Sequence, residues 1–572
     1  MLAISILSLC APAQDAAAAR AADLRIEHAL TCRPDGCWEV RVHGSGLDPG
    51  AGPLEFMLND WGEWRAVDAY YFEVIAADPP LAADATGFPP FATAIAPPDG
   101  IFDLTYELRV ADLDSEAHRN HGLLPFRTQS YAYGHTRNVF LEVRQAGATV
   151  AAEYTVELLP PEGADVFSGW AGRHAGPQRA GVDPAACNGI FAFGSASTER
   201  ILGSGADQIM VWHFGAARDV SDTVGVMVEM LAPAMGAALE SPAPSPLRVF
   251  VTDAGGGGMS SDHGFFVGYE ASTPDFVEHS TYFHQTIAHE LFHTWLGIRV
   301  PGNEDIVWFH EGFTDYFALW FLAATGGCER RWFAERVLEL DAEARATSSL
   351  GSISFADPDT AWRDGDGPNE RMAYQGGLLL ALALDVELRA AGKPGALQIV
   401  KDFLQDGVAP DLASVRGWIE SQGLKEFYAR CVAGAGPPAA QEGLERLGFV
   451  FERASVPLTY LGLCAEGVGL GARIVKVDPN GPAAAAGVRV GDVVGGYAPT
   501  RDGAVEIGSA VTTEYRFGLA LFEPAAKSVQ IWFERDGREV EIRIVPQIWD
   551  GGSRRVIGNA GEALDDFFRF ES

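Results

Sequence analysis

The sequence predicts a multidomain α+β protein, and three observations lead to this fold class. Its 572 residues are enough for about three or four domains, each with its own hydrophobic core. The first third of the chain alternates apolar and polar residues with the period of β-strands, whereas the middle has the longer period of amphipathic helices. Near the C-terminus the strand period returns on both sides of Asp536-Gly537, a strong hairpin signal. We therefore expect an N-terminal β-sandwich-like domain, a central α/β plus helical domain and a smaller C-terminal domain.

The overall charge is strongly acidic. Lys and Arg number 42 against 77 Asp and Glu, which gives a formal net charge of -35. Such a surface repels phosphate backbones and anionic membranes, so we expect no nucleic-acid partner. We also expect no transmembrane span, because no segment after the N-terminal residues has the roughly 18 unbroken apolar residues that a spanning helix needs.

Residues 1–22 are predicted to be a cleaved, bacterial-type export signal. A short apolar run, Leu2–Leu9, precedes the small residues Ala11-Pro12-Ala13, which suit a signal peptidase. No Lys or Arg precedes the run, so a disordered or truncated start is the alternative. The protein is accordingly expected to be exported, to the periplasm or beyond.

Residues 23–195 are predicted to form the N-terminal β domain. Apolar side chains alternate with more polar neighbours in several short segments separated by loops rich in Gly and Pro. The clearest segments are 38–42, 70–75, 104–110 and 154–158. No catalytic constellation occurs among these residues, so their expected role is to pack beside the next domain.

The period changes after about Thr198. Strands are predicted at Ile209–Phe214 and Leu247–Thr252, with a helix at Val220–Leu239 between them. A glycine run, Gly255–Gly258, follows the second strand. A mixed sheet packed beside a helix gives rigid support to any ligand that the helix carries.

The segment Thr286–Trp295 contains the pattern H-E-x-x-H, formed by His289, Glu290 and His293. Residues four apart share a face of a helix, so both histidines can present a ring nitrogen to one metal ion, with Glu290 beside them. A separate apolar stripe predicts that this helix is buried. The capping signal Thr273-Pro274-Asp275 predicts its start, and Gly297 its stop. The pattern predicts a catalytic zinc site that needs a third ligand, and the alternative is a pair of buried structural histidines.

A second predicted helix, Asp305–Thr325, supplies Glu311 as the candidate third ligand. Asp315 lies four residues later on the same face, where its carboxylate can accept a hydrogen bond from a ligand histidine and fix the tautomer of that ring. A third helix near Glu370–Ala391 and further helical residues complete a catalytic domain predicted over residues 196–450.

These motifs resemble those of the gluzincin metallopeptidases, in which a glutamate on the next helix completes H-E-x-x-H. The segment Trp308–Thr314 is similar to the W-x-x-E-G-F stretch of the aminopeptidase branch. The interval from Glu311 to Asp315 resembles the second-helix pattern of thermolysin-like enzymes. The resemblance implies a thermolysin-like catalytic domain that binds one Zn²⁺.

The third helix adds to this resemblance. Tyr374 followed by Gly377 is similar to the Y-x-K-G signature, whose tyrosine steadies the transition state. In this chain Gly376 stands in the position of the usual lysine. The resemblance implies that Tyr374 is a catalytic residue.

Residues 451–548 resemble a PDZ domain, and residues 549–572 are predicted to be a C-terminal tail. The segment Pro482–Val494 is similar to the central pattern of PDZ domains. The preceding residues resemble the carboxylate-binding loop, which implies peptide binding at Leu461, Gly462 and Leu463. A gluzincin followed by a PDZ domain most resembles the glycyl aminopeptidase family. The PDZ groove would bind a peptide ligand or pack on the catalytic domain, and both readings stay open.

The same family resemblance implies a substrate-binding strand at Gly256, Gly257, Gly258 and Met259. Glycine permits the close approach that an extended peptide needs in order to add its backbone to a sheet edge. Aminopeptidases of this branch end the strand with a glutamate that binds the free amine of the substrate, whereas this chain has Ser260. Without the negative charge of that glutamate, the substrate ammonium loses a contact on the order of a few kcal/mol.

The sequence therefore predicts a zinc metallopeptidase for peptide or protein substrates, of the glycyl aminopeptidase type. In this hypothesis Glu290 carries the proton from a zinc-activated water and Tyr374 donates to the oxyanion. Two alternatives stay open. Ser260 is compatible with an endopeptidase, and a decayed protease domain would leave an exported binding protein that works through its PDZ groove. The intact set of ligands and base argues against decay.

Overall fold

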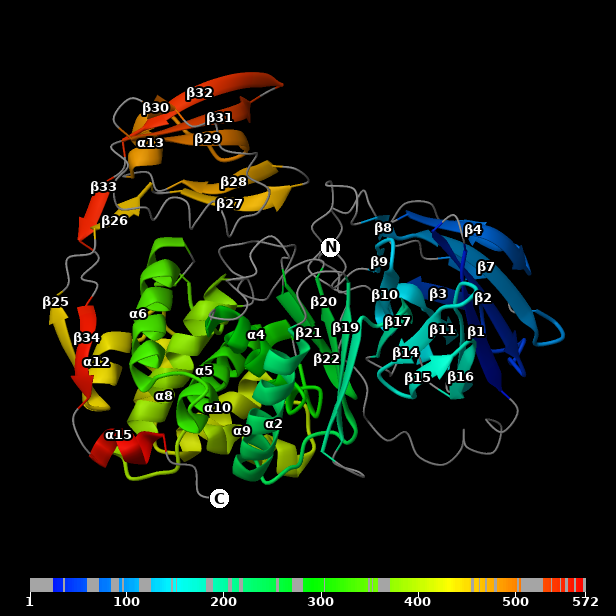
Figure 1. Ribbon diagram of the computed structural model, residues 1–572, viewed down its shortest axis with the longest axis horizontal. Coiled ribbons are helices and arrows are strands. Elements are labelled where there is room, and N and C mark those ends of the chain that lie inside the picture. The colour runs from blue at the N-terminus through cyan, green and yellow to red at the C-terminus, as the bar shows by residue number, and fades with distance from the viewer. Residues whose placement is uncertain are drawn as a thin grey trace. The chain divides into compact units, whose positions relative to one another are not determined.

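The structure is a computed structural model in which the chain divides into two compact units (Figure 1). The first unit is Met1–Pro233 with Ala243–Thr294, and the second is Ala234–Pro242 with Trp295–Ser572. The predicted export signal lies outside the residues that the structure describes. The described residues are 24–33, 36–58, 71–83, 92–94, 97–112, 125–145, 148–150, 152–181, 189–203, 208–215, 220–253, 257–269, 281–302, 304–347, 350–351, 353–357, 371–453, 457–461, 463–468, 471–477, 481–501, 504–505, 528–535, 537–545, 547–550, 554–559 and 562–568.

The N-terminal part of the first unit is built from three β-sheets. The first has the order β16 (Gln178–Gly181), β13 (Glu153–Leu159), β1 (Arg25–Cys32), β2 (Cys37–Ser45), β7 (Phe102–Arg109) and β4 (Tyr71–Asp78). The second is β15 (Gly172–Ala175), β14 (Asp165–Ser168), β17 (Ile190–Gly194), β10 (Tyr131–His135), β9 (Phe126–Arg127) and β8 (Ala111–Asp112). The third is β12 (Ala148–Thr149), β11 (Leu141–Gln145), β3 (Leu54–Leu58), β6 (Ala92–Ala94) and β5 (Leu81–Ala83). A one-turn helix, α1 (Thr136–Val139), joins β10 to β11.

This part is β-rich, as the alternating pattern predicts, but its described strands form three sheets where a sandwich would have two. Alternate side chains of the long strands β1, β2 and β7 enter one core, which includes Trp38, Val40 and Tyr106. Strands of two or three residues, such as β8 and β5, are too short to carry a period. In the third sheet this applies to β12, β6 and β5, which therefore gave no signal in the alternation.

A five-stranded mixed sheet completes the first unit. Its order is β18 (Thr198–Leu202), β19 (Ile209–Phe214), β20 (Leu247–Thr252), β22 (Gly264–Gly268) and β21 (Gly257–Ser261). Strands β19, β20 and β22 are parallel, and β21 runs antiparallel to β22 at the edge. The strands β19 and β20 lie at the predicted residues. One face of the sheet packs on the second N-terminal sheet, with Tyr133 against Phe266 at a centroid distance of 4.5 Å.

Two helices accompany this sheet, α2 (Ser221–Ala238) and α4 (Thr281–Phe292). Helix α4 buries Ile287 and Leu291 completely, and the ring of Phe283 meets the Tyr269 ring edge-on at 6.2 Å. The apolar stripe of α4 is the one that the sequence predicts. Its expected start at Thr273 lies outside the described residues.

The second unit is mainly helical. The described helices that precede its C-terminal β-structure are η3 (Glu304–Ile306), η4 (Trp308–Gly312), α5 (Phe313–Thr325), α6 (Arg330–Thr347), η6 (Met372–Gly376), α8 (Gly377–Ala390), α9 (Leu397–Asp406), α10 (Leu412–Ser421), α11 (Lys425–Phe427), η7 (Tyr428–Val432) and α12 (Ala440–Arg446). A short parallel pair, β23 (Leu296–Gly297) and β24 (Val300–Pro301), precedes them. Buried Asp385 ties α5 to α8, because it accepts hydrogen bonds from the Tyr316 hydroxyl at 2.7 Å and from Arg389. No described helix is both long enough and apolar enough to cross a lipid bilayer.

The C-terminal residues of this unit contain a smaller β-structure with its own core. Its sheet has the order β27 (Leu463–Val468), β28 (Gly471–Val477), β29 (Val493–Arg501), β31 (Ser528–Arg535) and β32 (Arg538–Ile544), with β30 (Ala504–Val505) paired to β29 and a short helix α13 (Pro482–Ala486). Ile474, Val494 and Phe533 lie in the core. Asp492, whose side chain is 2% exposed, pairs with Arg535 at 2.6 Å.

Residues 549–572, expected to be a tail, include a strand and a helix. Two strands that precede the C-terminal β-structure pair with two that follow it. Strand β25 (Phe449–Arg453) is antiparallel to β34 (Arg554–Asn559), and β26 (Pro457–Tyr460) is antiparallel to β33 (Gln547–Asp550). Helix α15 (Glu562–Phe567) follows, and Trp320 Nε1 donates to the Phe567 carbonyl at 3.1 Å. The C-terminal helix thus packs on α5.

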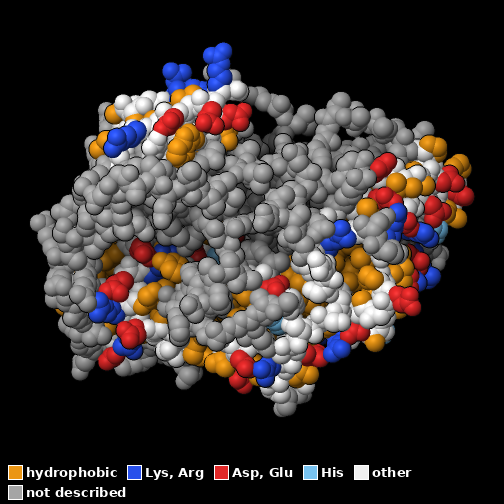
Figure 2. Space-filling view, turned by 45° about the horizontal axis from the view of Figure 1, so that its top comes forward, with side chains coloured by type: hydrophobic (Ala, Val, Ile, Leu, Met, Phe, Trp, Pro, Cys, Tyr) orange, Lys and Arg blue, Asp and Glu red, His pale blue; other side chains and the backbone are white. Residues whose placement is uncertain are grey.

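The described surface mixes both signs of charge. Figure 2 shows Asp and Glu side chains interspersed with Lys and Arg on the described parts of one face. Some charged side chains of the described residues form ion pairs, for example Arg173 with Asp165 at 2.7 Å and with Glu199 at 2.8 Å.

Candidate metal centre

His289 and Glu290 lie in the last turn of α4, and His293 is the first residue after that helix. His289 and His293 come from successive turns, and their Nε2 atoms are 2.9 Å apart. The two rings are nearly perpendicular, at 87°. His289 is buried and His293 is half-buried, so the pair lies at the edge of the protein interior.

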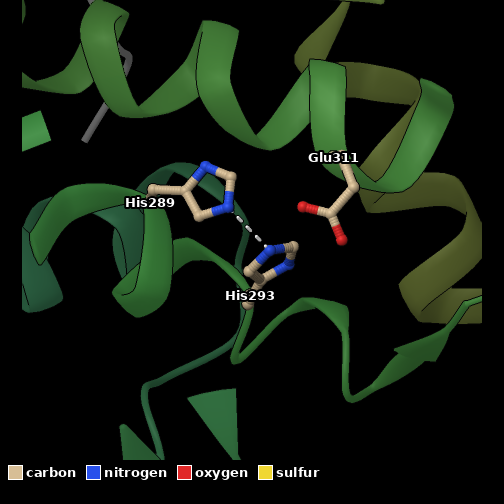
Figure 3. A group of neighbouring side chains, drawn as sticks. All are labelled: His289, His293 and Glu311. Atoms are coloured by element: carbon tan, nitrogen blue, oxygen red, sulfur yellow. Dashed lines mark hydrogen bonds between the residues drawn. The ribbon is translucent and has the colours of Figure 1, made fainter. Parts of the chain in front are cut away.

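Glu311, on η4, joins these two histidines. The three residues can each offer one ligand atom, and these atoms all lie within 4.8 Å of one another. Figure 3 shows His289 on one helix, His293 where that helix ends, and the Glu311 carboxylate directed toward their rings from another helix. The structure thus brings together the three residues that the spacing predicts as ligands.

The donor set fits zinc. Two imidazole nitrogens and one carboxylate oxygen are the ligands of many catalytic zinc sites, which keep a fourth position for water. Zinc to nitrogen distances of about 2.0–2.1 Å in a tetrahedral site place two nitrogens about 3.3 Å apart. The observed 2.9 Å between the ring nitrogens of His289 and His293 is close to this separation. Only a small movement of the rings would admit the ion.

Glu290 is buried on α4, where it contacts the edge strand β21. Ser260 Oγ donates toward Glu290 Oε2 at 2.8 Å and toward the Glu290 carbonyl at 2.7 Å. A Cβ atom on Gly258 would lie 2.6 Å from Glu290 Oε1 and 2.3 Å from Glu290 Cγ. The absence of a side chain at Gly258 therefore makes room for the carboxylate.

Tyr133, on β10, is a residue near Glu290 that the sequence did not indicate. Its hydroxyl is fully buried and has no hydrogen-bond partner among the described residues. Burial raises the pKa of Tyr133 well above its ordinary value, and the negative charge of Glu290 raises it further. The phenol is therefore neutral at physiological pH. No sequence motif marks this tyrosine, because its position depends on the packing of two sheets.

Glu311 and Tyr374 both lie on π-helical turns, η4 and η6, each of which leads into an α-helix. A Cβ atom on Gly312 would lie 2.3 Å from Gly377 Cα and 2.7 Å from the Ala373 carbonyl oxygen. The two turns therefore pack backbone to backbone. The sequence pattern did not predict these π-helical turns, a feature that is frequent at functional sites. Tyr374 is half-buried on η6, and Asp315 is half-buried on α5, one turn after Glu311.

Replacing Gly312 with Ala is expected to destabilise the second unit by about 1–3 kcal/mol, because backbone atoms cannot move aside as a side chain can. The variant should also bind zinc more weakly, since Gly312 follows Glu311. Gly417→Ala in α10 is the matched control, because a Cβ atom there meets nothing within 4 Å. The control should be neutral or slightly stabilising. Urea unfolding and zinc titration measure both effects, and equal stability of the two variants would contradict the packing argument.

The expected substrate strand and peptide loop are partly described. Gly257, Gly258 and Met259 lie on the edge strand β21, and the Met259 side chain is buried in the core on the opposite face from Glu290. Gly256 lies outside the described residues. Only the backbone of Met259 is therefore open to a substrate.

In the C-terminal β-structure the Leu461 side chain is buried in the core, and its carbonyl accepts a hydrogen bond from the Ala483 amide at 2.8 Å. Leu463 begins β27 and packs partly against the same core, while Gly462 lies outside the described residues. The structure gives these two leucines a packing role.

No protein-family profile and no curated protein matches the sequence. Among solved structures, the chain is similar to the crystal structure of an aminopeptidase N family protein from Idiomarina loihiensis, with a TM-score of 0.68 and 15% identity. The match covers 96% of this chain and 100% of that chain. The two chains share a mixed α/β, multidomain fold. 

Two further solved structures are more distantly similar. An M1 zinc metallopeptidase from Deinococcus radiodurans has a TM-score of 0.43 and 14% identity, over 71% of this chain and 91% of that chain. Yeast LTA4 hydrolase in complex with bestatin has a TM-score of 0.47 and 14% identity, over 73% of this chain and 68% of that chain.

Proposed function

We propose that this chain is a zinc-dependent peptidase that hydrolyses peptide bonds at the site formed by His289, His293 and Glu311. The observation that carries the proposal is the convergence of two imidazoles and one carboxylate, with Glu290 next to the first ligand in the chain. The fold shared with an aminopeptidase N family protein supports the same reading.

Each residue has a distinct task. Zinc bound by the three ligands would act as a Lewis acid and lower the pKa of a bound water toward about 7. Glu290 takes a proton from the attacking water and returns it to the leaving amine. Tyr374 donates a hydrogen bond to the oxyanion that develops on the substrate. Asp315 orients a ligand histidine through its second ring nitrogen.

The edge strand β21 provides a place for the substrate backbone. Gly257 and Gly258 expose a strand edge with no side chain, so an extended peptide can approach closely and pair with it. This arrangement suits a peptide or protein substrate in the extended conformation.

The finer assignment is an aminopeptidase of the glycyl aminopeptidase type, and one observation favours an endopeptidase as the second candidate. An aminopeptidase needs a counter-charge for the substrate ammonium. Ser260, which stands in place of the expected glutamate, is neutral and its hydroxyl faces Glu290. Among the described residues of β21, none carries a carboxylate.

A matched pair of peptides separates these candidates. One peptide carries a free amino terminus and the other is acetylated, and each is incubated with the zinc-loaded chain. Cleavage of only the free-amine peptide, one residue at a time, would assign an aminopeptidase, and equal cleavage of both would assign an endopeptidase. Cleavage of neither would contradict the peptidase proposal and favour a binding protein.

The remaining assignments concern the ends of the chain. The proposal includes export to the periplasm or beyond and a PDZ domain at residues 451–548 that binds a peptide ligand. The separate core around Ile474 and Phe533 supports an independent domain there. Amino-terminal sequencing of the mature protein tests export, and peptide binding to the full chain tests the PDZ assignment.

A further inference from the structure

The C-terminal end of α4 leaves backbone carbonyls that need partners from outside the regular helix. The His289 carbonyl accepts from the His293 amide at 3.1 Å. The Leu291 carbonyl accepts from both the amide and the hydroxyl of Thr294, at 3.1 and 2.8 Å. Between them, the Glu290 carbonyl lies 2.7 Å from Ser260 Oγ. A side chain of the neighbouring sheet thus caps this turn of the helix.

The same hydroxyl also reaches the carboxylate of Glu290. Ser260 Oγ is 2.8 Å from Glu290 Oε2, and both residues are buried, with exposed fractions of 8% and 6%. A hydroxyl has a single proton to donate. The main-chain carbonyl and the carboxylate of Glu290 therefore share Ser260 as one hydrogen-bond donor. A hydrogen bond to a charged group in a buried setting is stronger than one between neutral groups.

The strand geometry directs Ser260 to this contact. Strand β21 pairs with β22 so that Ser260 lies opposite Phe265 and Ser261 lies opposite Gly264. Successive side chains of a strand point to opposite faces. Gly258 and Ser260 therefore share the face that contacts Glu290, and the two residues confine its carboxylate from two sides.

We infer that Ser260 is a positioning residue for Glu290, which keeps the carboxylate and the end of the metal-binding helix in register with the edge strand. The inference rests on the proposed function, because Glu290 is the proton carrier of that reaction. The inference gives Ser260 a positioning role, in place of the amine binding that a glutamate at this position would provide. The task requires a hydroxyl at this position and no charge.

The test compares Ser260→Ala with Ser260→Thr and with Ser261→Ala as the matched control. Ser261 is also buried on β21, but its hydroxyl donates to the Gly264 carbonyl at 3.0 Å and does not reach Glu290. We expect Ser260→Ala to lower kcat about 10- to 100-fold, the range for loss of a hydrogen bond to a charged group. KM should be unchanged, Ser260→Thr should recover most of kcat, and Ser261→Ala should retain kcat.

A second readout does not depend on activity. Crystal structures of the zinc-loaded wild-type chain and of Ser260→Ala would show the conformer of Glu290. We expect a single conformer against β21 in the wild type and a turned or divided side chain in Ser260→Ala. An unchanged Glu290 conformer, or a kcat for Ser260→Ala equal to that of Ser261→Ala, would overturn the inference. A wild-type chain that cleaves no peptide would refute the proposed function instead, and the crystal structures would then decide the inference.

Discussion

Replacing Glu290 with Gln is expected to lower kcat for peptide hydrolysis at least about 1000-fold, within the range for loss of a general base. The amide has nearly the shape of the carboxylate, so it fits beside Gly258 and can still accept from the Ser260 hydroxyl. It cannot take a proton from water. Steady-state kinetics on a cleaved peptide would measure the loss.

Two controls accompany Glu290→Gln. Zinc content should stay at the wild-type value, because Glu290 is not among the three ligand residues. Glu541→Gln, an exposed position on β32, should keep full activity. An activity of Glu290→Gln within tenfold of the wild type would contradict the role of Glu290 as the general base.

Replacing Glu311 with Gln is expected to weaken zinc binding about 100- to 1000-fold. Zinc sites with four protein ligands are stabilised by roughly 10–16 kcal/mol, so each ligand contributes about 3 kcal/mol, and every 1.4 kcal/mol is tenfold in affinity. The amide oxygen of Gln keeps the shape of the ligand and loses its negative charge. Competition against a chelator of known zinc affinity would measure the change.

The peptidase activity of Glu311→Gln should depend on the zinc concentration. Glu311→Gln should be inactive at stoichiometric zinc and should recover part of its activity at high zinc. Glu426→Gln, an exposed position on α11, serves as the control and should bind zinc as the wild type does. Unchanged zinc affinity in Glu311→Gln would place the third ligand elsewhere.

The grouping of the three candidate ligands could be predicted because its information is local. His289 and His293 are one helical turn apart, and Glu311 lies in a long motif on the next helix. The strands β19 and β20 were predictable for a similar reason, since each is a short, mostly apolar segment rich in β-branched and aromatic residues. Local periodicity indicates such elements wherever burial follows the period of the backbone.

The remaining features depend on contacts between residues far apart in the chain. Ser260 meets Glu290 across 30 residues, and no pattern in either segment specifies that contact. The two π-helical turns η4 and η6 pack together where Gly312 meets Gly377, 65 positions away by their residue numbers. The pairing of β25 with β34 spans the whole C-terminal β-structure. A sequence motif indicates which chemistry is available, and tertiary packing determines how the catalytic carboxylate is held.

The most direct test of the central claim is peptide cleavage by the purified chain before and after removal of its metal. We expect one zinc ion per chain, loss of cleavage in the metal-free protein, and recovery on addition of one equivalent of zinc. Cleavage that persists without metal, or a chain that binds no zinc, would contradict the assignment of His289, His293 and Glu311 as a catalytic zinc site.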